Sequence, residues 1–275
     1  METRILCDCH IHSEHSHDSR SKISEVAEQC IKRRISIFAL TDHCDILHPD
    51  KEKVKMSVKA MLDDVTENAK RYMGQVEILR GIEVGEAMWD RALAEEILGS
   101  YDFDVVIGSV HSVRYKEYSM PYSRIDFSGF SRENINGYID KYFDEVMEML
   151  ELKNCDIMAH LTCPLRYING KYNLNIGIRK YKQKIEGILK FVIDNHIAME
   201  VNTSGVSAGL KSFMPDEWII EKFKTMGGEL VTLGSDAHIP QNVGIDFDKA
   251  TAVLRKYGFE KYCIYRKRKA VFVEL

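Results

Sequence analysis

The chain has 275 residues, of which 45% are hydrophobic, and its formal net charge is −4 at pH 7. This length and composition predict one large α/β domain, residues 1–275, with a substantial core. The charge offers no extended basic surface for nucleic acid, and no apolar run approaches the ~20 residues that span a bilayer.

Short apolar runs bounded by polar or glycine residues predict seven β-strands. They cover residues 5–10, 36–41, 76–83, 105–110, 156–160, 198–202 and 229–234. Amphipathic stretches between them predict helices, most clearly at 23–31, 138–150 and 185–192. Pro215 and the two acidic residues after it predict the start of another helix. This alternation of strands and helices indicates a parallel sheet.

Clusters of potential metal ligands lie at or just after the ends of six predicted strands. They are Asp8-Cys9-His10-Ile11-His12, Thr41-Asp42-His43, Gly81-Ile82-Glu83, Gly108-Ser109-Val110-His111, Ala159-His160 and Gly234-Ser235-Asp236-Ala237-His238. In an open, doubly wound sheet only a few strands reach the ligand, whereas in a barrel all strand ends converge on one face. The sequence therefore favours a (β/α) barrel of seven strands.

The residue types in these clusters suit one polynuclear metal site. His10 and His12 are two residues apart on a strand and face the same way, whereas Cys7 and Cys9 face the opposite side and are expected to pack in the core. Glu83 has two oxygens to share between ions. A mixed set of histidines and carboxylates suits Zn, Mn or Fe, and neighbouring ions of this kind assist hydrolysis.

Other polar residues near the clusters carry weaker predictions. Asp18 lies in the polar turn after the first strand, where His15 or His17 could replace it as a ligand. Four residues without strand-end context are expected at the surface or in structural roles: His48, His196, Glu14 and Glu86.

Two longer segments also carry predictions. Residues 112–132 form either a lid over the site or a surface excursion, and the basic run 266–269 is expected to be solvated. The start of the chain lacks the apolar segment of a secretory leader, and the seven cysteines show no disulfide spacing. We therefore expect a cytoplasmic protein with reduced thiols.

In their order along almost the whole chain, these clusters, together with Asp18-Ser19, resemble the polymerase and histidinol phosphatase (PHP) family. Two stretches resemble its histidinol-phosphatase members in particular. They are Ala159-His160-Leu161-Thr162-Cys163-Pro164-Leu165-Arg166-Tyr167 and Glu200-Val201-Asn202-Thr203-Ser204-Gly205. The resemblance implies a distorted, TIM-like (β/α)7 barrel that holds three divalent metal ions, either Zn, Mn or Fe.

The resemblance also divides the candidate ligands among the three ions. The first set is His10, His12, Glu83 and Asp236; the second is Glu83, His111 and His160; the third is Asp18, His43 and His238. Asp8 and Asp42 are expected to orient ligand histidines from outside the cluster. For Asp42, stabilisation of a turn is an equal alternative.

The activity that the resemblance implies is hydrolysis of L-histidinol phosphate, a small phosphomonoester, to L-histidinol and phosphate in histidine biosynthesis. Arg166 is expected to bind the phosphate through its guanidinium fork. Lys211 is the second candidate for binding the phosphate, near a position where such enzymes often carry a second arginine, although a lysine cannot make the bidentate contact. Asp236 or His238 is expected to transfer the proton. The sequence does not indicate an oligomeric state.

Three alternatives remain open. Another PHP phosphoesterase would act on nucleotides or other small phosphomonoesters, although the chain shows no basic track for a long polyanion. An amidohydrolase-like barrel would cleave carbon–nitrogen bonds, but the set of three metals that includes Asp18 argues against it. A catalytically silent metal-binding domain would have no need to keep every ligand.

Overall fold

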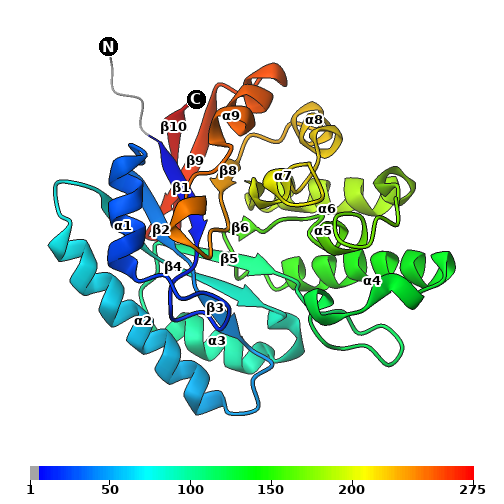
Figure 1. The fold of residues 1–275 in the computed structure, drawn as a ribbon, viewed down its shortest axis with the longest axis horizontal. Coiled ribbons are helices and arrows are strands. Elements are labelled where there is room, and N and C mark those ends of the chain that lie inside the picture. The colour runs from blue at the N-terminus through cyan, green and yellow to red at the C-terminus, as the bar shows by residue number, and fades with distance from the viewer. Residues whose placement is uncertain (1–5) are drawn as a thin grey trace.

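Seven parallel strands form a nearly closed barrel in the computed structural model, which describes residues 6–275 (Figure 1). In sheet order they are β1 (Cys7–Ile11), β2 (Ile37–Leu40), β4 (Glu77–Gly85), β5 (Val105–Ser109), β6 (Ile157–Met158), β7 (Ala198–Asn202) and β8 (Val231–Gly234). The barrel closes where the His12 amide donates to the Ala237 carbonyl at 3.0 Å and the Asp236 amide donates to His10 at 2.8 Å. The predicted barrel of seven strands is thus confirmed.

The strand predictions differ from the structure mainly at their ends. The first predicted strand begins at Ile5, which lies outside the described residues. The strand predicted at 156–160 has only two residues in ladder pairing, because the chain leaves the sheet before His160. The additional strand β3 (His43–Asp45) pairs with the second half of β4, beyond the part that pairs with β2. The strand that pairs with β4 on this side is therefore interrupted at Thr41 and Asp42, with β2 before the interruption and β3 after it.

Helices surround the barrel (Figure 1). They are α1 (Ile23–Lys32), α2 (Lys51–Arg71), α3 (Arg91–Ser100), α4 (Arg132–Glu151), α5 (Pro164–Ile168), α6 (Lys182–Asp194), α7 (Ser204–Ser207), α8 (Glu217–Thr225) and α9 (Phe247–Lys256). The helix start predicted after Pro215 is confirmed, since Asp216 caps α8 by accepting the Ile219 amide at 3.1 Å. No helix within residues 6–275 is long and apolar enough to cross a membrane.

The end of the barrel at which the parallel strands begin carries a hairpin that the sequence did not predict. Strands β9 (Lys261–Arg266) and β10 (Lys269–Glu274) pair antiparallel beside β1, where the Cys7 amide donates to the Tyr262 hydroxyl at 3.0 Å (Figure 1). The basic run is therefore not simply solvated, because two of its four residues make ion pairs. Arg266 binds Glu77, and Arg268 binds Asp156.

The predictions for two further features can be compared with the structure. Cys7 and Cys9 are buried on the side of β1 away from the metal-ligand candidates, as expected, and all seven cysteines are free. Residues 112–132 run largely over the surface, as one of the two alternatives expected, but Tyr122 and Phe127 bury their rings in the core. This segment forms one wall of the pocket described below.

Candidate metal centre

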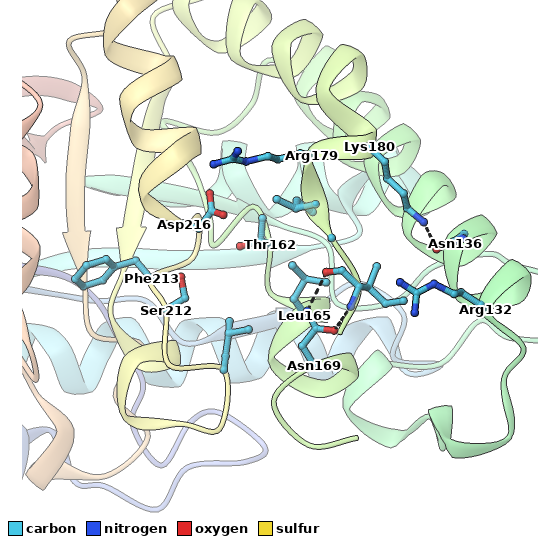
Figure 2. Close-up of a pocket in the computed structure, with 14 residues that line it drawn as sticks. Arg132, Asn136, Thr162, Leu165, Asn169, Arg179, Lys180, Ser212, Phe213 and Asp216 are labelled. Carbon is cyan, nitrogen blue, oxygen red and sulfur yellow. Dashed lines mark hydrogen bonds between the residues drawn. The ribbon is translucent and has the colours of Figure 1, made fainter. Parts of the chain in front are cut away.

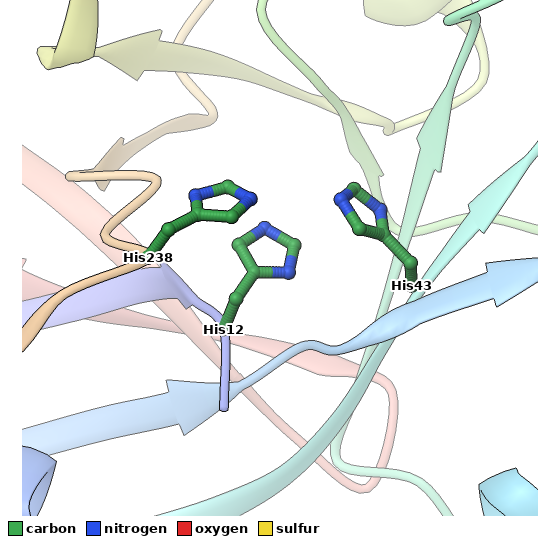
Figure 3. Close-up of side chains that lie close together, drawn as sticks. All are labelled: His12, His43 and His238. Carbon is green, nitrogen blue, oxygen red and sulfur yellow. The ribbon is translucent and has the colours of Figure 1, made fainter. Parts of the chain in front are cut away.

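The ligand-bearing strand ends meet at the C-terminal end of the barrel. The ligand atoms form four overlapping groups, within each of which all atoms lie within 4.8 Å of one another. The groups are His12, His43 and His238; His10, Glu83 and His160; His10, His12 and Asp236; and His43, Glu83 and His111. Figure 3 shows the first group, in which three imidazole rings come together from the residue after β1, from β3 and from the segment after β8. The clusters therefore form one site.

Glu83 lies at the middle of the site and is fully buried. Its Oε1 atom is 3.3 Å from His111 Nε2 and 3.2 Å from His160 Nε2. Its Oε2 atom faces the other way, 2.8 Å from His43 Nδ1 and 3.4 Å from His10 Nε2. Because each oxygen faces different histidines, this carboxylate has the arrangement required to bridge two ions.

The spacing of the imidazole nitrogens supports a site for cations. His10 Nε2 lies 3.1 Å from His12 Nε2, and His111 Nε2 lies 3.4 Å from His160 Nε2. Two neutral rings that face each other in this way repel through their lone pairs unless a proton or a metal ion lies between them. The histidine and carboxylate donors fit divalent ions such as Zn²⁺ and Mn²⁺, and none of the four ligand groups found among the described residues includes a cysteine.

The charge states of the two buried carboxylates and of His12 agree with this donor set, whereas neighbouring carboxylates raise the pKa of His10 and His43. Burial opposes ionisation of Glu83, but the neighbouring histidines, led by His43 and His111, hold its pKa well below the usual value. Burial likewise opposes ionisation of Asp236, and its hydrogen bond with His12 and the charge of His10 lower its pKa. The pKa of His12 is lowered by burial and by the neighbouring histidines. Ionised carboxylates and a neutral imidazole are the forms that bind metal.

Asp18 joins the site from the turn after β1. Its carboxylate lies 3.2 Å from His238 Nε2 and 3.6 Å from His43 Nε2. Of the two alternatives considered for this position, His15 turns away and contacts Asp64 at 3.2 Å, whereas His17 is exposed with its ring beside that of His43. The structure thus brings Asp18, and not His15, to the ligand histidines.

Glu200 on β7 holds two ligand histidines in place, a role that the sequence did not predict. Its Oε1 atom is 2.7 Å from His10 Nδ1, and its Oε2 atom accepts the His160 amide at 2.7 Å. Such a contact fixes the orientation of the ring and leaves the opposite nitrogen for the metal. An acidic residue in the middle of a fully buried strand is the sequence signal that could have found it.

Asp42 acts on His12 through a serine. Ser16 Oγ donates to Asp42 Oδ1 at 2.6 Å and lies 3.1 Å from His12 Nδ1. Asp42 also accepts the Ser13 amide and hydroxyl, both at 2.6 Å, so it stabilises the turn as well. Both expectations for Asp42 describe part of its role.

Asp8 differs from its prediction, because it contacts backbone and no imidazole ring. It accepts the amides of His10 at 3.3 Å, Ser235 at 3.0 Å and Gly244 at 2.9 Å. Burial raises its pKa to about 6, although these hydrogen bonds lower it. Asp8 therefore joins the ends of β1 and β8 rather than orienting a ring.

A pocket of about 410 Å³ lies over the cluster, and we call it the metal-centre pocket. Arg166, on α5, lines it, and its Nη1 atom donates to Ser204 Oγ at 3.2 Å and lies 3.8 Å from Asp236 Oδ2. Lys211 is exposed and does not line this pocket. The structure therefore brings one of the two predicted phosphate-binding residues to the metal ligands.

The prediction that Glu86 faces solvent is wrong, since this residue is buried and lines the pocket. Its backbone has a φ of 48°, which turns the side chain back so that Oε1 accepts the amides of His111 at 2.5 Å and Ser112 at 2.6 Å. Glu14 and His196 are exposed, as expected. His48 lines the pocket and accepts the Asp50 amide at 3.0 Å.

Comparisons with known proteins find relatives that match nearly the whole chain. The chain is 29% identical to a probable histidinol-phosphatase of Thermotoga maritima, covering 98% of this chain and all of that protein. It is 24% identical to the histidinol-phosphatase of Lactococcus lactis, covering 94% of this chain and 93% of that protein. The crystal structure of histidinol phosphate phosphatase from Lactococcus lactis, complexed with Zn, L-histidinol and phosphate, has the same fold, with a TM-score of 0.75 at 22% identity over 97% of this chain and 98% of that one.

The family comparison covers most of the strand ends that carry the candidate ligands. The PHP domain pattern matches residues 8–204, which include the first five ligand clusters, Arg166 and Glu200. The match spans more than half of the chain. The chain therefore belongs to the PHP domain family.

Proposed function

We propose that the chain is a single-domain phosphatase, residues 1–275, that hydrolyses L-histidinol phosphate to L-histidinol and phosphate in histidine biosynthesis. The observation that carries the proposal is the bridging position of Glu83 among four overlapping ligand groups, beside a pocket that contains Arg166. Relatives that match nearly the whole chain and are named histidinol-phosphatase support this substrate.

The proposal assigns nine residues to three divalent ions. His10, His12, Glu83 and Asp236 would hold the first, Glu83, His111 and His160 the second, and Asp18, His43 and His238 the third. When bound, such ions polarise the phosphoryl oxygens and lower the pKa of water. Glu200 and Ser16 keep the histidine rings turned toward the ions.

Arg166 is the proposed phosphate-binding residue. Its guanidinium group remains charged and can donate two parallel hydrogen bonds to the phosphate oxygens. The contact of Arg166 with Ser204 holds the guanidinium group near Asp236, so the phosphate would lie beside the metal ligands. Lys211 has no part in this proposal.

Asp236 is the better placed of the two proton-transfer candidates. Its Oδ1 atom faces His12 at 3.3 Å, whereas its Oδ2 atom accepts the Ser204 hydroxyl at 3.2 Å and faces Arg166. An ionised carboxylate between the ligands and the phosphate can accept the proton of the attacking water and return it to the leaving alkoxide. Both ring nitrogens of His238 have partners, namely Asp18 and the Asp236 carbonyl.

Glu86 and Ser112 would bind the ammonium group of the substrate. Glu86 Oε1 accepts two amides, but no described residue donates a hydrogen bond to Oε2. Ser112 lines the same pocket, and its buried hydroxyl has no partner among the described residues. A protonated amine supplies donors for both oxygens and compensates the charge of the carboxylate.

The test is phosphate release by metal-stripped protein restored with Mn²⁺, Zn²⁺ or Fe²⁺. We expect L-histidinol phosphate to have a higher kcat/KM than nucleoside monophosphates, sugar phosphates and p-nitrophenyl phosphate. Glu86→Gln should raise KM for L-histidinol phosphate and leave p-nitrophenyl phosphate unaffected, whereas Glu14→Gln, at an exposed position, should change neither. A preference for a nucleotide would overturn the substrate, and retained activity in Glu83→Ala would overturn the metal mechanism.

A further inference from the structure

A second hollow, of about 680 Å³, is lined by Leu165 of α5, the helix whose Arg166 and Tyr167 line the metal-centre pocket (Figure 2). We call it the α5 hollow. Its apolar part comes from buried side chains that include Leu165, Ile178 and Phe213. Arg132 and Lys180 also line it, and none of the proposed metal ligands does. Its size is typical of pockets that bind small molecules.

The cations around the α5 hollow make no close ion pairs among the described residues, although the charge of Arg179 acts on the Asp216 carboxyl and that of Asp140 on Lys180. Arg132, Arg179 and Lys180 form no ion pair within 4 Å in the part of the chain that the structure describes; Arg132 donates to the Asn175 carbonyl at 3.4 Å, and Lys180 donates to the neutral Asn136 side chain (Figure 2). The guanidinium carbon of Arg179 lies 5.7 Å from the ring centroid of Trp218. Many other lysines and arginines of this chain make ion pairs.

The charge in the α5 hollow contrasts with that of the whole chain. Its lining contains three cations and one carboxylate, Asp216, whose Oδ1 atom already caps α8. The chain as a whole carries a net charge of −4. Burial and the positive charge of Arg132 lower the pKa of Lys180, so the cations repel each other. A bound anion would relieve that repulsion.

We propose that the α5 hollow binds a small anion with an apolar body, held by its phosphate or carboxylate oxygens. The arginines and Lys180 supply charged donors for the oxyanion, and the apolar side chains cover the remainder of the ligand. Binding in the α5 hollow does not depend on the proposed catalytic function, whereas its effect on catalysis rests on that function.

The position of α5 couples the two cavities. Leu165 and Asn169 face the α5 hollow, whereas Arg166 and Tyr167 line the metal-centre pocket. Residues of one short helix cannot move independently, so a ligand that shifts Leu165 also shifts the proposed phosphate-binding guanidinium group. Occupancy of the α5 hollow therefore changes the KM of the phosphatase reaction.

Calorimetric titration of inorganic phosphate into the metal-loaded protein tests the site. We expect two phosphates per wild-type chain, one at Arg166 and one in the α5 hollow. Arg179→Gln with Lys180→Gln should weaken the second by on the order of tenfold or more and leave one phosphate per chain. The matched control is Lys59→Gln with Lys190→Gln, which removes two exposed cations that pair with Asp63 and Asp194 and should retain both phosphates.

Benzoate distinguishes a carboxylate ligand from a phosphate ligand. It should bind the wild type and raise or lower KM for p-nitrophenyl phosphate, and the Arg179→Gln, Lys180→Gln protein should lose both effects. Equal stoichiometry and affinity for phosphate and benzoate in this variant and the wild type would overturn the proposed site. An unchanged KM at saturating benzoate would overturn the coupling through α5.

Discussion

The two ends of the barrel use charged side chains in opposite ways. At the end with the hairpin, Asp156 accepts the Val106 amide at 2.8 Å and pairs with Arg268, while Glu77 pairs with Arg266 at 2.8 Å. At the other end, Glu83 is surrounded by histidines alone, and imidazole nitrogens face one another. One end satisfies its charges within the chain, whereas the other leaves them for a ligand.

Because of this difference, residues of one strand can serve stability at one end of the barrel and function at the other. Glu77 and Glu83 both belong to β4, but one makes an ion pair with arginine and the other lies among ligand histidines. In α/β barrels, polar residues at the carboxyl ends of strands serve catalysis, whereas those at the opposite end serve stability. Substitutions at the two ends should therefore affect different measurements.

The largest effect is expected for Glu83→Gln. Loss of the bridging carboxylate should lower kcat/KM for phosphate release by on the order of 10³-fold or more, since bound ions supply several kcal/mol of transition-state stabilisation. The variant should also lose most of the rise in Tm that Mn²⁺ or Zn²⁺ gives the stripped wild type, because metal binding stabilises the folded state. Glu77→Gln, on the same strand, is the control and should retain both. Metal-dependent activity in Glu83→Gln would contradict the bridging role.

A smaller loss is expected for Glu200→Gln, which keeps the side-chain volume and removes the charge beside His10. Contacts behind metal ligands typically contribute 10–100-fold to metal affinity or activity. We expect a decrease of about that size in kcat/KM, partly restored by excess Mn²⁺ in the assay. Loss of activity without any change in metal affinity, measured by titration of the stripped protein, would show that Glu200 does not act through His10.

At the other end of the barrel, Asp156→Asn should affect stability and not catalysis. Its carboxylate is mostly buried and joins the hairpin to β5 and β6. Loss of a charge-assisted hydrogen bond and an unpaired Arg268 should lower the free energy of unfolding by ~1–3 kcal/mol, measured with urea. The kcat of the folded protein should remain unchanged. A loss of kcat larger than the loss of folded protein would contradict the separation of the two ends.

The end with the metal ligands was largely predictable from the sequence, and the reason is local. Each ligand follows a short apolar run, so its position at a strand end can be recognised from a few neighbouring residues, as for His111 and His160. The barrel follows because so many strand ends carry ligands. The exact lengths of the strands do not follow, since the shortness of β6 depends on pairing with two other strands.

The residues that were missed act through contacts that are distant in sequence. Glu200 contacts His10, 190 positions away, and its strand reads as ordinary core. Glu86 depends on a left-handed backbone turn that the sequence around it does not require. Arg268 is 112 positions from Asp156, so a basic run near the end of the chain did not indicate a hairpin that packs against the barrel. Local patterns cannot identify partners of this kind.

The smallest effect is expected for His15→Gln, at the margin of the metal end. His15 is two residues from Ser13 and three from Asp18, yet its ring contacts Asp64, where both side chains are partly exposed. Exposed pairs of this kind contribute ~0–1 kcal/mol, so Tm should fall by only a few degrees at most, and kcat/KM should stay within about twofold of the wild type. The comparison is Asp18→Asn, whose carboxylate faces His238 at 3.2 Å and should be required for full metal occupancy. Metal analysis of the two purified variants distinguishes the two roles. Loss of a bound ion from His15→Gln, together with its retention in Asp18→Asn, would show that His15 and not Asp18 is the metal ligand.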